Sequence, residues 1–317
     1  MSGELHCHSF YSVDGWAVPE QVAEAAAAAG VSTLSLTDHN SVCGLGRART
    51  QALALGLRFI DGVELDVTWR GSNYHTLAFG FDPGHARVLE VCAHNRRCYE
   101  LDFGRWAPIL ARRWSISADG LRAGLHERYP GVRWPVLNRW FALDYMVQSG
   151  IFPDRAAARD AMQAVAREAE AHLSAQEIWP WASLEQARDA VHGAGGVLLL
   201  AHVGGFADTL RGQLQLVSQM LEAGLDGFEL FHPANTRFEH FSELASHARR
   251  MGCAVSGGSD SHGVDAGGPG GCGHVPVPDW TVQSIDTALR QRRNRELRCS
   301  ERGETPAAPL GLGEECQ

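Results

Sequence analysis

The chain has 317 residues, a formal net charge of -9 at pH 7 and a pI near 5.9. That length suits one large α/β barrel domain or two smaller domains. The acidic charge excludes the basic footprint of a duplex nucleic-acid binder and favours a small phosphorylated partner. The eight cysteines form no CxxC pair or disulfide framework, and no segment reads as a secretory signal or membrane span. We therefore expect a reduced, cytoplasmic, soluble enzyme without a membrane partner, whose oligomeric state the sequence leaves unknown.

The first 85 residues alternate between short apolar runs and helical periods. We expect strands at 4–7, 33–37, 58–64 and 74–79, and helices at 19–30 and 42–55. The helix over 19–30 has Pro in its first turn, Ala throughout and Gly at its end, which are ordinary helix start and stop signals. This half of the pattern predicts the beginning of a parallel α/β sheet.

The alternation returns in the last third of the chain. We expect strands at 196–201, 227–231 and 254–257, and helices at 183–194, 210–223 and 237–251. Strands that alternate with helices favour a parallel sheet, and seven such units favour its closure into a barrel. The barrel domain is therefore predicted to comprise residues 1–85 and 183–298.

Residues 86–182 break this rhythm. They are rich in Arg, Trp and Ala, have a helical pattern almost throughout and lack the His and Asp strings found elsewhere. We expect a helical insertion that caps the barrel rim between the fourth and fifth strands. Residues 299–317 are polar and aperiodic, with Pro and Gly, so we expect a disordered tail.

Several apolar runs end in His, Asp or Glu, which would place these side chains at the carboxyl ends of strands, where barrel enzymes carry their chemistry. Imidazole and carboxylate are ligands that divalent Zn, Mn and Fe accept. The candidate metal ligands are His6, His8, Asp14, His39, Glu64, His75, His202, Asp260 and His262. So many ligands suffice for two or three ions.

The spacing of these residues supports the metal interpretation to different degrees. His6 and His8 are two residues apart, so on an extended chain both would point to one face and Cys7 to the other. A lone HxH pair is weak evidence, since surface and core histidines are common. Glu64 ends an apolar run, where a carboxylate is costly to bury unless charged partners or metal compensate. A salt bridge to a barrel arginine is the alternative, and a carboxylate bridging two ions is favoured.

Other positions have alternatives in which the residue binds neither metal nor phosphate. His75 and His202 could each be a hydrogen-bonded core histidine. The Gly-rich run at 267–273 could cradle a phosphate, although a mobile loop is the favoured interpretation. Asp38 adjoins a candidate ligand, and we expect it to orient a histidine.

The strings ELHCHSFYSVDG, LTDHNS, NYHTLAF, LLAHVGG and GGSDSHG resemble the polymerase and histidinol phosphatase (PHP) superfamily of metal-dependent phosphoesterases. The resemblance covers residues 4–80 and 196–263. It implies an α/β fold, namely a distorted (β/α)7 barrel with a helical insertion (cap) between strands 4 and 5. It also implies a cofactor of two to three divalent ions of Mn, Fe or Zn.

The resemblance implies a role for each candidate ligand. The first ion would be held by His6, His8, Glu64 and Asp260. The second would be held by Glu64, His75 and His202, and the third by Asp14, His39 and His262. Two departures stand out: one extra residue precedes Asp14, and the family's GRPH-like string becomes LNRW at 137–140, which retains Arg139 and lacks the His.

Arg139 and His232 are the candidate catalytic and substrate-binding residues. A guanidinium matches phosphate bidentately, and Arg139 occupies the family's arginine position, although a solvated helix charge is an equal alternative. His232 follows the sixth strand in FELFHPAN and is read as a phosphate-oxygen donor, a leaving-group contact or a packed histidine.

The expected activity is hydrolysis of phosphoric ester bonds by a phosphatase or cyclic phosphodiesterase. The substrate would be a small phosphorylated metabolite, either a nucleotide, a sugar phosphate or a cyclic phosphate. A hydroxide bridging two ions would be the nucleophile. The alternatives are a nuclease or exonuclease of the same superfamily, and a non-catalytic metal-binding accessory module. An amidohydrolase would usually need a strand-end Lys or another His spacing.

Overall fold

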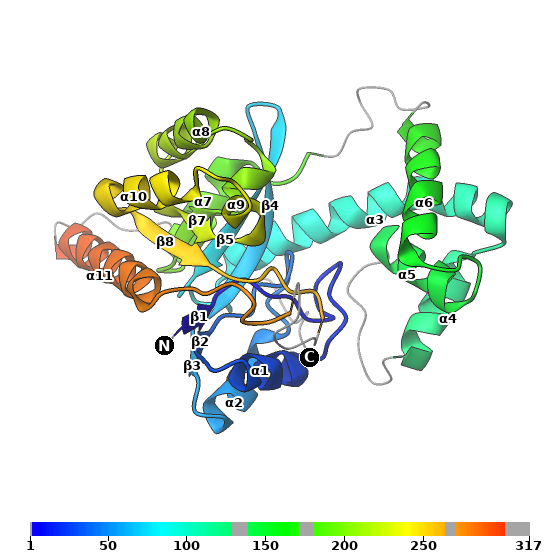
Figure 1. Ribbon diagram of the computed structural model, residues 1–317, viewed down its shortest axis with the longest axis horizontal. Helices are drawn as coiled ribbons and strands as arrows, with labels where there is room; N and C mark the ends of the chain where they lie inside the picture. Colours follow the sequence, from blue (N-terminus) through cyan, green and yellow to red (C-terminus); the bar gives the residue numbers. More distant parts are fainter. Residues whose placement is uncertain (1, 129–138, 171–179, 264–270, 302–317) are drawn as a thin grey trace. The chain divides into compact units, whose positions relative to one another are not determined.

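The computed structural model describes residues 2–128, 139–170, 180–263 and 271–301 (Figure 1). The chain divides into two compact units, Met1–Cys92 with Ala182–Gln317, and Ala93–Trp181. Both are built of regular elements, and the first contains all the described strands, so the protein has a mixed α/β fold.

The first unit has two sheets. A three-stranded parallel sheet has the order β1-β2-β3 and consists of β1 (Ser2–Glu4), β2 (Val31–Leu34) and β3 (Arg58–Phe59). A five-stranded mixed sheet has the order β4-β5-β6-β7-β8 and consists of β4 (Gly62–Trp69), β5 (Ser72–Phe79), β6 (Val197–Leu200), β7 (Gly227–Phe231) and β8 (Ala254–Gly257). In it, β5 is antiparallel to both of its neighbours, and β6, β7 and β8 are parallel.

The prediction of one strand over 58–64 in an all-parallel sheet is wrong. β3 ends at Phe59, and a new strand, β4, begins at Gly62 and continues to Trp69. The chain then reverses through Arg70 and Gly71, whose φ angles of 49° and 78° suit the two-residue turn of a hairpin. Glu64 and the His75 of β5 consequently lie inside strands and not at strand ends.

Backbone hydrogen bonds connect the two sheets at the ends of their strands. The amide of Leu5, after β1, donates to Gly257 O of β8 over 3.1 Å, and His8 N donates to Ser261 O over 2.8 Å. On the other side, Asn40 N, after β2, donates to Glu64 O of β4 over 2.8 Å. The segments that follow β1, β2 and β8 therefore gather beside β4.

Helices accompany the strands of the first unit: α1 (Pro19–Ala28), α2 (Leu45–Ala54), α7 (Leu184–Gly193), α8 (Leu210–Glu222), α9 (Pro233–Thr236), α10 (Phe241–Met251) and α11 (Asp279–Glu301). The 3-10 turn η2 (Val203–Gly205) follows β6. Ser183 caps α7 by accepting a hydrogen bond from Gln186 N over 3.1 Å. The helix expected over 237–251 starts later, at Phe241.

Helix α11 was not predicted. Its residues 299–301 lie in the segment expected to be a disordered tail, and residues 302–317 are outside the described part of the chain. Most of the Gly-rich run at 267–273 is also outside it. The second unit contains most of α3 (Ala86–Trp114), with α4 (Ala118–Arg128), α5 (Arg139–Gln148) and α6 (Arg155–Glu170), so the expectation of helices there is confirmed.

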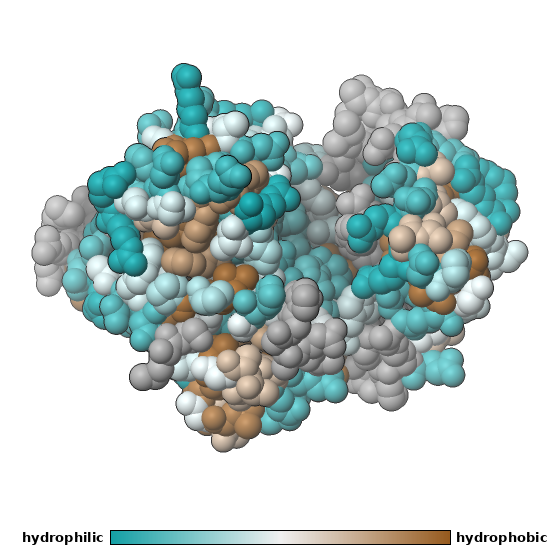
Figure 2. All heavy atoms as spheres, in the orientation of Figure 1, coloured by the Kyte–Doolittle hydropathy of each residue, from teal (hydrophilic) through white to brown (hydrophobic). Residues whose placement is uncertain are grey.

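The surface of the described residues is mainly hydrophilic on the face shown in Figure 2. Hydrophobic residues gather at the lower edge of this view, over α1 and α2. Leu53 and Leu55, at the end of α2, are 60% and 41% exposed. No helix in the described ranges is both long and apolar enough to cross a membrane.

Asp226, just before β7, is the centre of a charged cluster that connects α7 and α11 to the sheet. Its carboxylate accepts from Arg292 Nη2 over 2.6 Å and from Leu198 N over 2.9 Å, and lies 2.8 Å from His192 Nε2. Burial alone would raise the pKa of Asp226, but His192 and Arg292 lower it below the ordinary value.

Asp226→Asn is expected to destabilise the fold by about 1–3 kcal/mol at neutral pH, because hydrogen bonds to a charged, mostly buried group are lost. The pKa of Asp226 is lower in the folded state than in the unfolded state, where it is about 3.9. Its charge therefore stabilises the fold at pH values above about 3.9. This contribution is lost as the pH falls through the lower pKa of the folded state. Urea unfolding from pH 7 to pH 3 should therefore show the difference from wild type shrinking in acid. The control is Asp208→Asn, whose carboxylate is 87% exposed; equal losses in both variants would contradict the assignment.

Candidate metal centre

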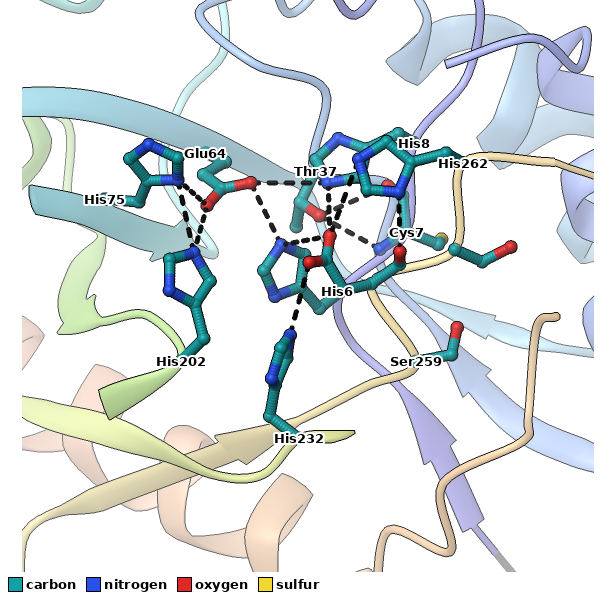
Figure 3. A network of polar contacts seen from close by, with 12 residues as sticks. His6, Cys7, His8, Thr37, Glu64, His75, His202, His232, Ser259 and His262 are labelled. Carbon is teal, nitrogen blue, oxygen red and sulfur yellow. Dashed lines mark hydrogen bonds and ion pairs between the residues drawn. The ribbon is translucent and has the colours of Figure 1, made fainter. Parts of the chain in front are cut away.

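The segment after β1 places two histidines on one side of an extended chain. His6 and His8 are fully buried and point into a polar cluster, as predicted from their spacing (Figure 3). Cys7 points elsewhere, and its thiol donates to Ser35 O over 3.4 Å. The local strand geometry therefore delivers both imidazoles to one site.

Glu64 lies at the middle of this cluster and is 1% exposed (Figure 3). On β4, Val63, Leu65 and Val67 pack into the hydrophobic core, so the alternation of the strand turns Glu64 to the polar side. Its carboxylate lies within 3.3 Å of five imidazoles, those of His6, His8, His39, His75 and His202.

The two oxygens of Glu64 face different histidines. Oε2 lies 2.9 Å from His6 Nε2. Oε1 lies 3.0 Å from His75 Nδ1 and 3.2 Å from His202 Nε2. A carboxylate whose two oxygens face separate sets of imidazoles could hold two cations at once.

Asp260, after β8, contributes a second carboxylate. It lies 3.0 Å from His8 Nε2 and 3.3 Å from His6 Nε2, both measured to Oδ1. Together with Glu64, these residues offer four ligand atoms that all lie within 4.8 Å of one another. This group contains the same four residues as the first ion site implied by the resemblance.

Asp14, His39 and His262 lie on the neighbouring side of the cluster. Asp14 Oδ2 is 3.1 Å from His262 Nε2 and 3.6 Å from His39 Nε2. His39 is also 3.3 Å from Glu64 Oε2 and forms a group with Glu64 and His75. His39 thus lies between the second and third sets of ligands.

Each of the nine candidate ligands lies within hydrogen-bonding or ion-pair distance of another member of the set. They come from segments as far apart as residues 6 and 262. His232 adjoins them, with Nε2 3.3 Å from Asp260 Oδ2. Arg139 is the first residue of α5, and its side chain lies outside the described part of the structure.

The tautomer of His232 follows from its backbone contact. Its Nδ1 accepts a hydrogen bond from Ala234 N over 2.9 Å, so in the neutral ring the proton is on Nε2. Nε2 can then donate to Asp260 or to an oxygen of a bound substrate. The ring is 5% exposed and belongs to the wall of the cluster.

Glu229 on β7 is a fully buried carboxylate that the sequence analysis missed. It lies 2.9 Å from His6 Nδ1 and accepts from His202 N over 2.7 Å. When His6 Nδ1 donates to Glu229, the lone pair of Nε2 faces Glu64 and is available to a cation. The signal was present in the sequence as a carboxylate within the apolar run GFELF.

Glu229→Gln is expected to weaken metal binding by about 10-fold to 100-fold, because it perturbs the partner that fixes the His6 ring. Metal affinity by competition with a chelator is the measurement, with activity at saturating metal as a second readout. Glu185→Gln, at an exposed position on α7, is the matched control. Wild-type affinity in Glu229→Gln would show that His6 is oriented without it.

Asp66 and Glu4 are two further buried carboxylates that the sequence analysis missed. Asp66 shares the polar side of β4 with Glu64, two residues on, and lies 3.1 Å from His75 Nε2. Glu4 accepts from Ser259 N over 2.9 Å and from Gly273 N over 2.7 Å, and so holds the segments on either side of 264–270. Asp66 extends the cluster, whereas Glu4 supports its backbone.

The expectation that Asp38 orients a histidine is not met by its hydrogen bonds. Asp38 instead accepts from Ser9 N over 2.5 Å and from Ser9 Oγ over 2.8 Å. These bonds fix the loop that follows His8. Burial raises the pKa of Asp38 to about 6.

Electrostatic coupling is strong throughout the cluster. Burial alone would raise the pKa of Glu64, but His39 and His6 lower it well below the ordinary value. Burial would lower the pKa of His6, but Glu229 and Glu64 raise it well above the ordinary value. The buried carboxylates are therefore stabilised by nearby positive charge. A bound metal cation would supply that charge and displace protons from the histidines.

Backbone strain accompanies the cluster. His202 has a φ of 25° and Asp260 a φ of 54°, a region that residues other than Gly seldom adopt. Such conformations persist where the surrounding structure holds them, and they concentrate at functional sites. Here they aim one imidazole and one carboxylate at the cluster.

A buried assembly of imidazoles and carboxylates on a mixed α/β fold is typical of metal-dependent hydrolases. The PHP domain model matches residues 4–107. A 3′,5′-nucleoside bisphosphate phosphatase from Chromobacterium violaceum is 31% identical over 276 residues, which cover 84% of this chain and 88% of the relative. The chain therefore belongs to the PHP family, and the family resemblance of its motifs is confirmed.

Two further comparisons agree with this assignment. A 5′-3′ exoribonuclease from Haemophilus influenzae is 28% identical over 262 residues, which cover 82% of this chain and 89% of the relative. A solved structure from Bifidobacterium adolescentis, assigned as a metal-dependent phosphoesterase, aligns with a TM-score of 0.72 and 29% identity, and covers 90% of this chain and 96% of that one. The named relatives hydrolyse phosphoester bonds, on substrates of different size.

Proposed function

We propose that this protein is a metal-dependent phosphoesterase that hydrolyses a small phosphorylated metabolite, with a nucleotide as the first candidate. The observation that carries the proposal is the Glu64 carboxylate, whose two oxygens face separate sets of histidines at 2.9–3.3 Å. The nucleotide is preferred over a sugar phosphate because the bisphosphate phosphatase is similar over most of both chains.

The donor set fits two or three divalent ions of Mn, Fe or Zn. Imidazole nitrogen and carboxylate oxygen are ligands for these ions. The ligand atoms of His6, His8, Glu64 and Asp260 lie within 4.8 Å of one another, and atoms of Glu64, His75 and His202 lie 3.0–3.2 Å apart. We propose the ligands His6, His8, Asp14, His39, Glu64, His75, His202, Asp260 and His262. When bound, the ions would lower the pKa of water and polarise phosphoryl oxygens.

The protein's own groups then bind and orient the substrate. Glu64 and Asp260 would hold the ions, and Glu229 keeps His6 in the ligating tautomer. His232, with its proton on Nε2, donates to a phosphoryl or leaving-group oxygen next to Asp260. Arg139 is proposed to bind a phosphate bidentately.

We also propose that the strands of the first unit form the distorted barrel of the family. The backbone bonds from Leu5 to Gly257 and from Asn40 to Glu64, which join the edges of the two sheets, support closure. The insertion at 86–182 enters the chain between β5 and β6 and supplies arginines and tryptophans suited to reading a substrate. We propose that it acts as the substrate-selecting cap.

A substrate panel tests the proposed function. Protein loaded with Mn would be assayed for phosphate release from nucleoside bisphosphates, nucleoside monophosphates, sugar phosphates and cyclic phosphates, with metal-free protein as the control. The highest kcat/KM is expected for a nucleotide. Lack of metal-dependent hydrolysis of every member would contradict the proposal.

A 5′-3′ exoribonuclease is the second candidate, because the relative with that activity also matches over most of its length. The same preparation would be assayed on a short RNA with a 5′ phosphate. Stepwise release of nucleotides, with a kcat/KM above that for the best small phosphate ester, would replace the first candidate with this one.

A further inference from the structure

A cavity of about 780 Å³ lies apart from the candidate metal centre. Its lining includes Asp226, which directly precedes β7, and Ala254, which begins β8. His232 and Asp260 follow the other, carboxyl ends of these two strands. The cavity therefore opens at the opposite end of β7 and β8 from the metal centre, beside α10 and α11.

The lining of this cavity is positively charged. Three guanidinium groups, from Arg249 of α10 and from Arg292 and Arg295 of α11, face a single carboxylate, Asp226. Asp226 is paired with Arg292 over 2.6 Å. A local excess of cations in a chain of net charge -9 concentrates small anions.

Arg249 and Arg295 differ from those arginines of the first unit that are paired with carboxylates. On other surfaces of the first unit, Arg47 is paired with Glu20 and Arg58 with Asp286. Arg249 instead lies over the ring of Trp280, with Cζ 4.4 Å from the ring centroid. Among the described residues, neither Arg249 nor Arg295 has a carboxylate partner.

Two buried N–H groups add donors to the positive wall, one from an indole and one from a guanidinium. Trp280 Nε1 and Arg292 Nε are buried and have no hydrogen-bond acceptor among the described residues. Both residues line the cavity, and neither of these atoms can act as an acceptor. The wall therefore combines charged and uncharged groups that favour a negatively charged occupant.

We propose that this cavity is a second binding site, separate from the metal centre, for a phosphorylated small molecule of nucleotide size. Its volume is within the range of small-molecule sites and exceeds the need of a single phosphate. Arg249 and Arg295 bind the phosphate, since guanidinium groups match its oxygens, and the Trp280 side of the cavity accommodates the organic part. The proposal does not depend on the substrate of the metal centre.

Binding of adenosine 5′-monophosphate and of inorganic phosphate to chelator-treated, metal-free protein tests this site. Isothermal titration would compare wild type with Arg249→Ala/Arg295→Ala. The matched control is Arg250→Ala/Arg293→Ala, which removes the same charge from α10 and α11 outside the cavity lining. We expect the first pair to weaken nucleotide binding by at least about 10-fold and the control pair to leave it within about 2-fold.

Hydrogen exchange locates the site independently of affinity. Bound nucleotide should protect amides in α10 and in residues 280–295 of α11 in wild type and in the control pair. Equal affinity in all three proteins, protection confined to the segments around the metal ligands, or no binding of either probe to wild type would overturn the proposal. We expect the nucleotide to bind more tightly than inorganic phosphate. Tighter binding of inorganic phosphate would overturn the proposal that the ligand is of nucleotide size.

Discussion

Glu64→Gln is expected to reduce kcat by about 10³-fold or more and to lower the number of bound ions. The carboxylate is the contact shared by five histidines, and Gln replaces one of its two anionic oxygens with an amide nitrogen that cannot ligate. Positioned metal ions supply several kcal/mol of transition-state stabilisation, so losing their bridge removes a large part of the rate enhancement.

Steady-state kinetics on the best substrate, together with elemental analysis of the same sample, measure this effect. Glu185→Gln is the matched control and should retain both activity and metal. Circular dichroism separates loss of the site from loss of the fold. Full activity and full metal content in Glu64→Gln would rule out a bridging role for this carboxylate.

Arg139→Ala is expected to lower kcat/KM by about 10²-fold or more, equivalent to about 2.7 kcal/mol of transition-state stabilisation. The reason is the loss of one charge-assisted phosphate contact, while the metal ligands stay intact. Kinetics on the best substrate and metal analysis test it, with Arg122→Ala, an exposed arginine of α4, as the control. Wild-type kinetics in Arg139→Ala would show that Arg139 does not bind the phosphate of the substrate.

That the ligands lie together in one site was predictable, because they occur in short sequence strings whose local backbone geometry fixes the direction of their side chains. His6 and His8 point to one side since an extended chain alternates its side chains, and that geometry is observed. The strand-end placement of Glu64 and His75 was wrong. The turn at Arg70 and Gly71, which reverses the chain from β4 into an antiparallel β5, was not predicted.

The supporting carboxylates were harder to predict. Glu229 is the one charged residue of β7, and Asp66 shares β4 with Glu64. From one sequence, such a carboxylate can be a ligand, a hydrogen-bond partner or a member of a salt bridge. Only the fold shows that Glu229 meets His6, 223 residues away. Helix α11 was missed although Val282, Ile285 and Leu289 recur at helical spacing in its first half and are buried in the core. Its second half is rich in Arg, and Arg292 bonds to Asp226.

The central claim is that the nine candidate ligands hold a multinuclear metal centre. Elemental analysis of active protein, purified without added chelator and normalised to protein concentration, tests it most directly. We predict two to three equivalents of Mn, Fe or Zn per chain, with activity that disappears on chelation and returns with the metal. Full activity in protein that contains one equivalent or less would contradict the account.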